Sequence, residues 1–267
     1  MTKPRLLVFT DLDGTLLDHD TYRWQAAEPA LERLRRANIP VILNSSKTAP
    51  EIRDIRGALN NDHPFIVENG AAVVIPANCF GSGAEQVVNF GAPLDRVLAV
   101  LQHLRSQGFR FRGFADMSAE ELARCTGLSL ASAGLARERL GTEPLLWEGT
   151  DEERECFAEQ LAAENLRLVR GGRFFHVMGN FDKADGVRFL LSKYREHYGR
   201  ESLVTVALGD SPNDQKMLES VNLPVIIRGV LSDQVQLTSD RHAMRSLKPG
   251  PEGWNECVLN ILIEYGY

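Results

Sequence analysis

The sequence predicts an α/β protein with a mostly parallel sheet, into which a second α/β unit is inserted. Three observations lead to this fold class. Strand-like apolar runs alternate with helix-like segments at both ends of the chain, polar clusters follow several of these runs, and the middle of the chain changes to strands with alternating polar residues. The 267 residues, 43% of them hydrophobic, suffice for one large domain or two smaller ones.

The first part of the chain reads as alternating strands and helices. Apolar runs predict strands over Arg5–Thr10, Ile39–Leu43 and Phe65–Val67. Apolar residues at helical spacing predict a helix over Ala26–Ala37, and a second helix follows the second strand and ends near Leu59. This alternation favours parallel strands that are covered by helices.

The middle of the chain has a different pattern. After the stretch Gly81-Ser82-Gly83, the segments Phe109–Arg112 and Arg173–Val177 alternate apolar and polar residues, which is typical of an antiparallel sheet with one face in water. Helices expected over Leu94–Arg105 and Glu152–Ala163 would cover the other face. We therefore expect a separate α/β unit at residues 83–180.

The last part of the chain returns to the first pattern. A helix is expected to begin at Lys183, and strands are expected over Leu203–Leu208 and Pro224–Ile227. Residues 1–82 and 181–267 are therefore expected to form one domain around the parallel sheet, which the inserted unit interrupts.

Composition argues against several functional classes. The net charge of −6 and the lack of dense Lys and Arg clusters argue against a nucleic-acid partner, and no apolar segment is long enough to cross a membrane. The four cysteines lie apart without metal-binding spacing, and the first residues carry no export signal. We therefore expect a cytoplasmic protein with reduced thiols, whose oligomeric state the sequence leaves open.

Polar side chains follow three of the predicted strands of the parallel sheet. Asp11 and Asp13 end the first strand, Ser45 follows the second, and Asp210 and Asp214 follow the strand at 203–208. Because the carboxyl ends of parallel strands meet at one edge of a sheet, we expect these side chains to lie close together. Grouped carboxylates are the hard oxygen ligands that Mg²⁺ takes in proteins, so the sequence predicts a metal site at this edge.

The order of an acid pair, a hydroxyl, a lysine and a second acid pair resembles the haloacid dehalogenase superfamily of phosphohydrolases over the whole chain. Within this superfamily the chain is similar to the mannosyl-3-phosphoglycerate phosphatase family. Besides Asp11-Leu12-Asp13-Gly14-Thr15, the phrases that carry the resemblance are Asn44-Ser45-Ser46-Lys47-Thr48, Glu68-Asn69-Gly70-Ala71, Phe175-His176-Val177, Gly209-Asp210-Ser211-Pro212-Asn213-Asp214 and Gly250-Pro251-Glu252-Gly253-Trp254.

The resemblance implies a Rossmann-like core, an inserted cap of the C2B type, and a Mg²⁺-dependent phosphomonoesterase that works through an aspartyl-phosphate. Asp11 would be the nucleophile, and Asp13 would protonate the leaving oxygen and then activate water. Lys183 and the hydroxyl of Ser45 would bind phosphoryl oxygens. A metal ion is needed because a carboxylate approaching a phosphate dianion at about 4 Å is repelled by about 8 kcal/mol at an effective dielectric of about 20.

The metal ligands implied by the resemblance are Asp11, Asp210 and the backbone carbonyl of Asp13. Asp214 is also assigned to the metal site. It would cap the helix that follows, and it would also steady Lys183 or a metal-bound water.

The cap is expected to select the substrate. A glycosylated phosphoglycerate carries a carboxylate, which a cation would bind. The Arg139–Pro144 stretch resembles a family phrase, with Leu140 in place of a glutamate. His176 could equally be a cap-surface residue or a substrate contact. The candidate substrate-binding residues are Lys47, Arg139, Glu143, Arg170, Arg173, His176 and Asn213.

The expected partner is a small phosphorylated molecule, with neither nucleic acid nor membrane involved. Two alternatives stay open at this point. One is a phosphotransferase such as a phosphomannomutase, which would pass the phosphoryl group from the same aspartate to a sugar hydroxyl. The other is a sugar-phosphate-binding protein without activity.

Overall fold

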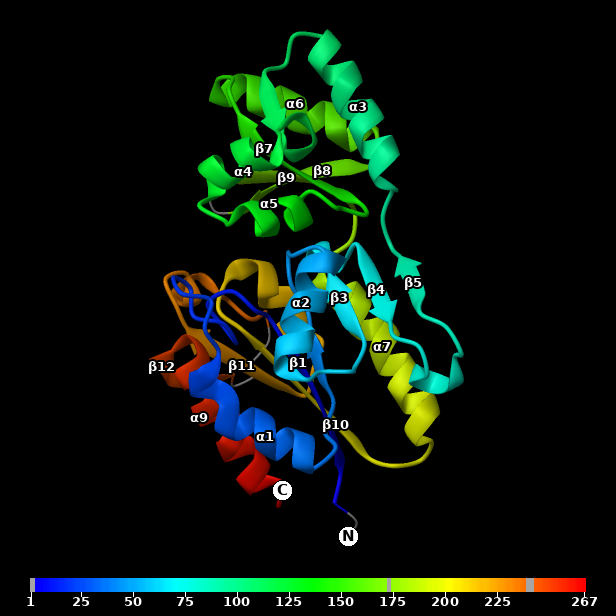
Figure 1. The fold of residues 1–267 in the computed structure, drawn as a ribbon, viewed down its shortest axis with the longest axis vertical. Helices are drawn as coiled ribbons and strands as arrows, with labels where there is room; N and C mark the ends of the chain where they lie inside the picture. Colours follow the sequence, from blue (N-terminus) through cyan, green and yellow to red (C-terminus); the bar gives the residue numbers. More distant parts are fainter. Residues whose placement is uncertain (1–2, 172–173, 239–242) are drawn as a thin grey trace.

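The chain folds into two layered bodies, one above the other, in a computed structural model that describes residues 3–171, 174–238 and 243–267 (Figure 1). The lower body, which holds both chain ends, is called the main domain here, and the upper body is called the cap. The pairing of the strands and the buried clusters define how each body is built.

A parallel five-stranded sheet forms the centre of the main domain, within the described residues, in the order β12-β11-β10-β1-β2. Alternate residues of β1 pack on opposite faces, so the strand is buried on both sides, as a parallel sheet requires. The strands are β1 (Arg5–Thr10), β2 (Val41–Leu43), β10 (Leu203–Gly209), β11 (Leu223–Arg228) and β12 (Met244–Pro249).

Helices cover both faces of this sheet. On one face, α1 (Glu28–Arg36), α2 (Ala49–Leu59) and α9 (Gly250–Glu264) share an apolar cluster with Leu6 and Val8 of β1. On the other face, Leu7 and Phe9 pack against α7 (Lys183–Tyr198) and α8 (Gln215–Glu219). The strands and helices predicted for the ends of the chain are confirmed, with bounds that coincide or shift by one or two residues.

A second, antiparallel sheet extends the main domain and moves one predicted boundary. It consists of β3 (Phe65–Val67), β4 (Ala72–Ile75) and β5 (Gln86–Asn89), and a single bridge between Asn44 and Ile66 joins it to β2. Because β5 pairs with β4, the chain leaves the main domain between 89 and 94, and the boundary predicted at residue 83 is wrong. The glycines around residue 82 form a loop between two paired strands rather than a linker.

The cap contains a four-stranded antiparallel sheet in the order β6-β7-β9-β8. The helices α3 (Leu94–Ser106) and α6 (Asp151–Ala163) cover its outer face through a shared apolar cluster. The strands are β6 (Phe111–Gly113), β7 (Thr142–Trp147), β8 (Leu166–Gly171) and β9 (Phe174–Gly179).

The inner face of the cap sheet was expected to be exposed to solvent, but two short helices cover part of it. The helices α4 (Ala119–Thr126) and α5 (Leu130–Ala136) lie between the cap sheet and the main domain (Figure 1). Leu146 and Phe174 of the sheet pack against them. Both helices are too short to give a clear apolar periodicity, so the sequence did not reveal that they cover part of this face.

Single 3₁₀ turns join several of these elements: η1 (Gln25–Ala27), η2 (Glu68–Gly70), η3 (Cys79–Gly81), η4 (Phe114–Asp116), η5 (Pro212–Asp214) and η6 (Ser232–Gln234). The two crossings between the main domain and the cap lie side by side, because a Cβ atom built on Gly91 would overlap the ring of Phe181. In the described part of the chain, no helix combines the length and the apolar character that crossing a membrane would require.

Candidate active site

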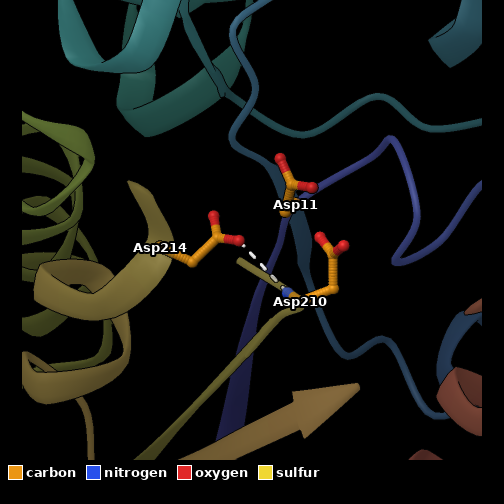
Figure 2. Close-up of side chains that lie close together, drawn as sticks. All are labelled: Asp11, Asp210 and Asp214. Carbon is orange, nitrogen blue, oxygen red and sulfur yellow. Dashed lines mark hydrogen bonds between the residues drawn. The ribbon is translucent and has the colours of Figure 1, made fainter. Parts of the chain in front are cut away.

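The predicted polar clusters meet at the carboxyl edge of the parallel sheet. Thr10 of β1 pairs with Leu208 of β10, so Asp11 and Asp210 follow neighbouring strands at the same level. The amide of Asp11 donates to the carbonyl oxygen of Leu208 at 2.9 Å. One oxygen from each of Asp11, Asp210 and Asp214 lies within 4.8 Å of the others, and Figure 2 shows the three carboxylates grouped at this edge.

Lys183 places a positive charge among these carboxylates. Its ammonium group donates to Oδ1 of Asp11 at 2.5 Å and to Oδ1 of Asp214 at 2.6 Å, and its side chain is 1% exposed. Burial by itself would lower the pKa of Lys183, but the charges of Asp11 and Asp214 outweigh that effect and raise it. The lysine therefore stays protonated and holds the two carboxylates in place.

Asp214 uses both of its oxygens within the protein. Oδ1 accepts a hydrogen bond from the ammonium group of Lys183. Oδ2 accepts the amide of Ser211 at 3.2 Å and the amide of Asp210 at 3.1 Å, and Figure 2 shows the second of these two contacts. These contacts show that Asp214 both caps the start of η5 and steadies Lys183. Whether it also contacts a metal ion stays a prediction.

Asp210 is held from three sides in a tight space. Thr15 donates its hydroxyl to Oδ1 of Asp210 at 3.1 Å. A Cβ atom at Gly14, whose φ is +81°, would lie 2.7 Å from Oδ2, and one at Gly229 would lie 2.9 Å from it. The two glycines therefore leave the room that this carboxylate occupies, and Gly14 also provides the left-handed turn after Asp13.

The carboxylates carry more negative charge than Lys183 can balance. Burial, followed by the charges of Asp11 and Asp214, raises the pKa of Asp210 to about 7. Burial likewise raises the pKa of Asp11, and it raises that of Asp214 to about 6 against the opposing effect of Lys183. A site of hard oxygen atoms with unbalanced negative charge has the chemistry that a divalent cation such as Mg²⁺ requires.

Asp13 forms an ion pair with Lys47 and is not part of the close group of Asp11, Asp210 and Asp214. Nζ of Lys47 lies 2.9 Å from Oδ2 of Asp13 and 4.9 Å from the centre of the Tyr22 ring. Burial would lower the pKa of Lys47, but the charge of Asp13 outweighs this and the pKa is raised. Oδ1 of Asp13 is buried and has no hydrogen-bond partner among the described residues, so it is available to an incoming group.

Ser45 lies in the turn that follows β2. The amide of Asn44 donates to the carbonyl oxygen of Thr10 at 2.9 Å, which fixes the turn beside the end of β1. The side-chain amide of Asn44 donates to the carbonyl oxygen of Lys183 at 3.0 Å. Ser45 is buried, and its hydroxyl oxygen accepts the amide of Lys47 at 3.3 Å. The turn is thus tied both to β1 and to the start of α7.

Trp254 is a residue of this site whose contribution the sequence did not reveal. Its indole N–H donates to Oγ1 of Thr10 at 3.0 Å, and that hydroxyl donates to the carbonyl oxygen of Asp11 at 2.7 Å. Both Trp254 and Thr10 are fully buried. The contact fixes the backbone of Asp11 from the far end of the chain, and a single tryptophan in an apolar helix gives no local signal of it.

The cap residues proposed for substrate binding fall on different faces of the cap sheet. His176 is opposite Val169 and Pro144 on the inner face, and its Nδ1 is buried without a hydrogen-bond partner in the described chain. Burial lowers the pKa of His176 to about 3, so the ring is neutral. His176 is therefore placed to receive a polar group that enters between cap and main domain.

Glu143 and Arg170 lie on the outer face instead. Glu143 is opposite Val177, and Arg170 is opposite Phe175, both of which pack towards α3 and α6. Glu143 accepts the amide of Ala115 at 2.8 Å, and burial raises its pKa to about 7. Glu143 lies near enough to Arg139 and to Glu68 of the main domain for their charges to affect its pKa, and Arg170 is exposed.

The other candidates have separate positions. Asn213 is exposed next to the site, and its side-chain amide lies 3.5 Å from Oδ1 of Asn69. Arg139 is buried, and its guanidinium donates to oxygens of Thr142, Ala136 and Ser46. Arg173 lies outside the described residues. The roles of these three residues in substrate binding stay predictions.

Comparison with known proteins identifies the family of this chain. The family model of the haloacid dehalogenase-like hydrolases matches residues 8–111 and 146–229. A glucosyl-3-phosphoglycerate/mannosyl-3-phosphoglycerate phosphatase of Methanococcoides burtonii is 38% identical, over 96% of this chain and 97% of the relative. A protein of the same name from Persephonella marina is 36% identical, over 97% and 98%.

Solved structures show the same fold. The phosphatase BT1666 of Bacteroides thetaiotaomicron superposes with a TM-score of 0.67 over 99% of this chain and 96% of that protein, at 21% identity. The likeness extends over the main domain and the cap together.

Proposed function

Since this chain belongs to the haloacid dehalogenase-like hydrolases and is a phosphatase of that family, as its motifs predicted, we propose that it hydrolyses glucosyl-3-phosphoglycerate or mannosyl-3-phosphoglycerate with the help of Mg²⁺. The two relatives with this activity in their names match nearly the whole chain, so the likeness includes the cap that would contact the sugar. The alternative of a protein without activity is set aside.

The observation that carries the proposal is the group formed by Lys183, Asp11 and Asp210. It combines a carboxylate that can attack phosphorus, a protonated lysine that can neutralise phosphoryl oxygens, and a second carboxylate that can share a cation. A site that only bound a neutral ligand would not need this density of acidic groups around one buried lysine.

Asp11, Asp210 and the backbone carbonyl of Asp13 are the groups that would hold Mg²⁺. Their oxygen atoms suit this ion. Burial, followed by the negative charges of Asp11 and Asp214, raises the pKa of Asp210, and the ion would neutralise those charges. When bound, the ion supplies the positive charge that lets an anionic nucleophile approach a phosphate. Asp214 is committed to Lys183 and to backbone amides, so we assign it to positioning the lysine.

Asp11 would act as the nucleophile. Its carboxylate oxygen forms a bond to phosphorus while the bond from phosphorus to the ester oxygen breaks. Asp13 gives its proton to that leaving oxygen, and it then takes a proton from the water that attacks the aspartyl-phosphate and releases inorganic phosphate. Lys183 and Ser45 would bind phosphoryl oxygens through both steps.

Lys47 would recognise the carboxylate of the glycerate. In a 3-phosphoglycerate the carboxylate lies three carbons along from the leaving oxygen, and Lys47 is already in contact with Asp13, the group that protonates this oxygen. A cation at this position distinguishes a phosphoglycerate from a plain sugar phosphate.

The test is phosphate release by the purified protein with Mg²⁺. We expect glucosyl-3-phosphoglycerate or mannosyl-3-phosphoglycerate to be hydrolysed with a higher kcat/KM than hexose 1-phosphates or hexose 6-phosphates. Asp11→Asn should lower kcat by more than about 10⁴-fold while the circular dichroism spectrum is retained. Equal activity on all these esters would contradict the proposed substrate. A fully active Asp11→Asn variant would contradict the assignment of Asp11 as the nucleophile.

The phosphotransferase alternative gives a different product. A mutase supplied with a hexose 1-phosphate would form hexose 6-phosphate and little inorganic phosphate. Separating the sugar phosphates by chromatography in the same assay therefore decides between transfer to water and transfer to a sugar.

A further inference from the structure

Glu68 is a buried carboxylate of the main domain that the proposed mechanism does not use. It follows β3 in the turn η2 and is 0% exposed. Its φ is +51°, that of Asn69 is +57° and that of Gly70 is +100°, so three consecutive residues have a backbone that side chains other than glycine rarely adopt. Such a backbone persists where surrounding contacts hold it, and the contacts of the Glu68 side chain lie in the cap.

The carboxylate of Glu68 binds one stretch of the cap. Oε1 accepts the amide of Leu140 at 2.6 Å. Oε2 accepts the amide of Gly141 at 3.2 Å, the amide of Thr142 at 3.0 Å and the hydroxyl of Thr142 at 2.7 Å. The guanidinium of Arg139 lies 3.7 Å from the same oxygen. Four charge-assisted hydrogen bonds thus attach residues 140–142 to a single side chain.

The backbone of the same turn binds the loop that carries Ser45. The amide of Glu68 donates to the carbonyl oxygen of Lys47 at 2.9 Å, and the amide of Asn69 donates to that of Ser45 at 2.9 Å. Arg139 completes the connection, because its Nη2 donates to the carbonyl oxygen of Ser46 at 3.2 Å. The loop at residues 45–47 is therefore held between Glu68 and the cap segment at 139–142.

We propose that Glu68 is a positioning residue that clamps the cap segment Arg139–Thr142 to the phosphate-binding turn at Ser45–Lys47. The clamp fixes the position of the inner face of the cap, which carries His176, relative to the reacting phosphate. This inference rests on the proposed function. Loss of the clamp should affect some substrates and not others. A substrate whose sugar reaches the cap needs the clamp, whereas a small phosphate ester that contacts only the main domain does not.

The first measurement is hydrogen exchange at residues 140–142. In Glu68→Gln the side-chain amide turns an N–H towards groups that are themselves donors, so part of the hydrogen bonding is lost. We expect the amides of Leu140, Gly141 and Thr142 to exchange at least about tenfold faster in this variant than in the unmodified protein. The matched control is Glu121→Gln, because Glu121 caps α4 and pairs with Arg112 within the cap.

The second measurement compares two substrates. For the glycosyl-3-phosphoglycerate that is turned over best, Glu68→Gln should lower kcat/KM about tenfold or more, mainly through a higher KM. For p-nitrophenyl phosphate, kcat/KM should change less than about threefold. Equal losses on both substrates would overturn the proposal, because they would show that Glu68 serves the reaction centre or the fold as a whole.

A milder pair of variants covers the case in which Glu68→Gln does not fold. Thr142→Val removes the hydroxyl that donates to Glu68 and accepts from Arg139, and Thr142→Ser keeps it. We expect faster exchange and a raised KM in the valine variant, and values within about twofold of the unmodified protein in the serine variant. Identical behaviour of the two variants would overturn the proposal.

The outcomes separate this inference from the proposed function. If the unmodified protein hydrolyses p-nitrophenyl phosphate but no glycosyl-3-phosphoglycerate, the proposed substrate fails. The exchange of residues 140–142 is measured without substrate and still decides whether Glu68 holds the cap segment. Unchanged exchange in Glu68→Gln would overturn the inference even with the substrate confirmed.

Discussion

At the scale of single residues, Lys183 is a buried cation on which two carboxylates depend. Asp11 and Asp214 are each within 2.6 Å of its ammonium group, and all three side chains are almost fully buried. Removing one member of such a group leaves a buried charge without a partner, which costs more than the intact group contributes.

We therefore expect Lys183→Met to lower the free energy of unfolding by about 3–5 kcal/mol at neutral pH in the absence of divalent metal. Denaturation in urea, followed by circular dichroism, measures this difference. Lys193→Met, on the more exposed part of the same helix, serves as the control and should stay within about 0.5 kcal/mol. An unchanged stability of Lys183→Met would contradict the inferred dependence of the carboxylates on this lysine.

His176 should make stability depend on pH in the acidic range. Its pKa is about 3 in the folded protein, against an ordinary value of 6.5. Below pH 6.5 the unfolded chain binds a proton that the folded chain does not, so stability falls as the pH is lowered from 6.5 towards 3. The loss approaches about 1.4 kcal/mol per pH unit, or about 2 kcal/mol between pH 6.5 and 5.

The comparison of His176→Gln with the unmodified protein isolates this effect, because the other titrating groups are common to both. Urea denaturation at a series of pH values should show a difference in the free energy of unfolding that changes by about 2 kcal/mol from pH 6.5 to 5, to the disadvantage of the histidine. A difference that is independent of pH would show that His176 titrates as it does in water.

At the scale of elements, the turn η2 positions two parts of the site at once. Glu68 binds the cap, and two residues later Gly70 approaches the start of α7 so closely that a Cβ atom would overlap the carbonyl oxygen of Asp182. Asp182 caps α7, whose first residue is Lys183. The backbone of this turn therefore helps to position the start of α7, and with it the ammonium group of Lys183.

Gly70→Ala should accordingly displace α7 as well as strain the turn. We expect a loss of about 3 kcal/mol or more in the free energy of unfolding, because the positive φ and the overlap both act against the new methyl group. Gly81→Ala is the matched control, since Gly81 also has a positive φ but open space around it. Its loss should be only about 1–2 kcal/mol, and equal losses in thermal or urea denaturation would refute the close approach.

The elements that hold the proposed catalytic groups could be predicted from the sequence because their signals are local. Asp11 and Asp210 each follow a short apolar run, and the ends of parallel strands must meet. The position of Glu143 and Arg170 could not be predicted in this way. Both faces of the cap sheet are at least partly covered, so alternation alone does not show which face is turned towards the main domain.

Contacts between distant residues were beyond the reach of sequence patterns. Glu68 lies more than seventy positions from the cap amides that it binds, and the indole of Trp254 reaches Thr10 from the other end of the chain. No local propensity encodes such pairs. The family resemblance singled out the phrases that contain Glu68 and Trp254, but it did not indicate what either side chain contacts.

At the scale of the whole molecule, the site joins strands from both halves of the main domain, so a bound cation should stabilise the fold. We expect Mg²⁺ at about one hundred times its Kd to add about 2.7 kcal/mol and to raise the Tm by several degrees. Chelation with EDTA should reverse this shift and abolish phosphate release, and added Mg²⁺ should restore both.

The variant Asp210→Asn tests where the cation binds. It removes one carboxylate from the group formed with Asp11 and Asp214, so the rise in Tm with Mg²⁺ should be largely lost. A variant that still gains the full rise would place the cation elsewhere, and phosphate release that persists in EDTA would contradict the metal requirement.

Gly91 and Phe181 lie next to each other where the chain enters and leaves the cap. Both ends of the insertion leave neighbouring points of the main domain, and the insertion has a sheet and an apolar cluster of its own. A folded unit of another size could therefore connect the same two points while the strands of the main domain keep their pairing.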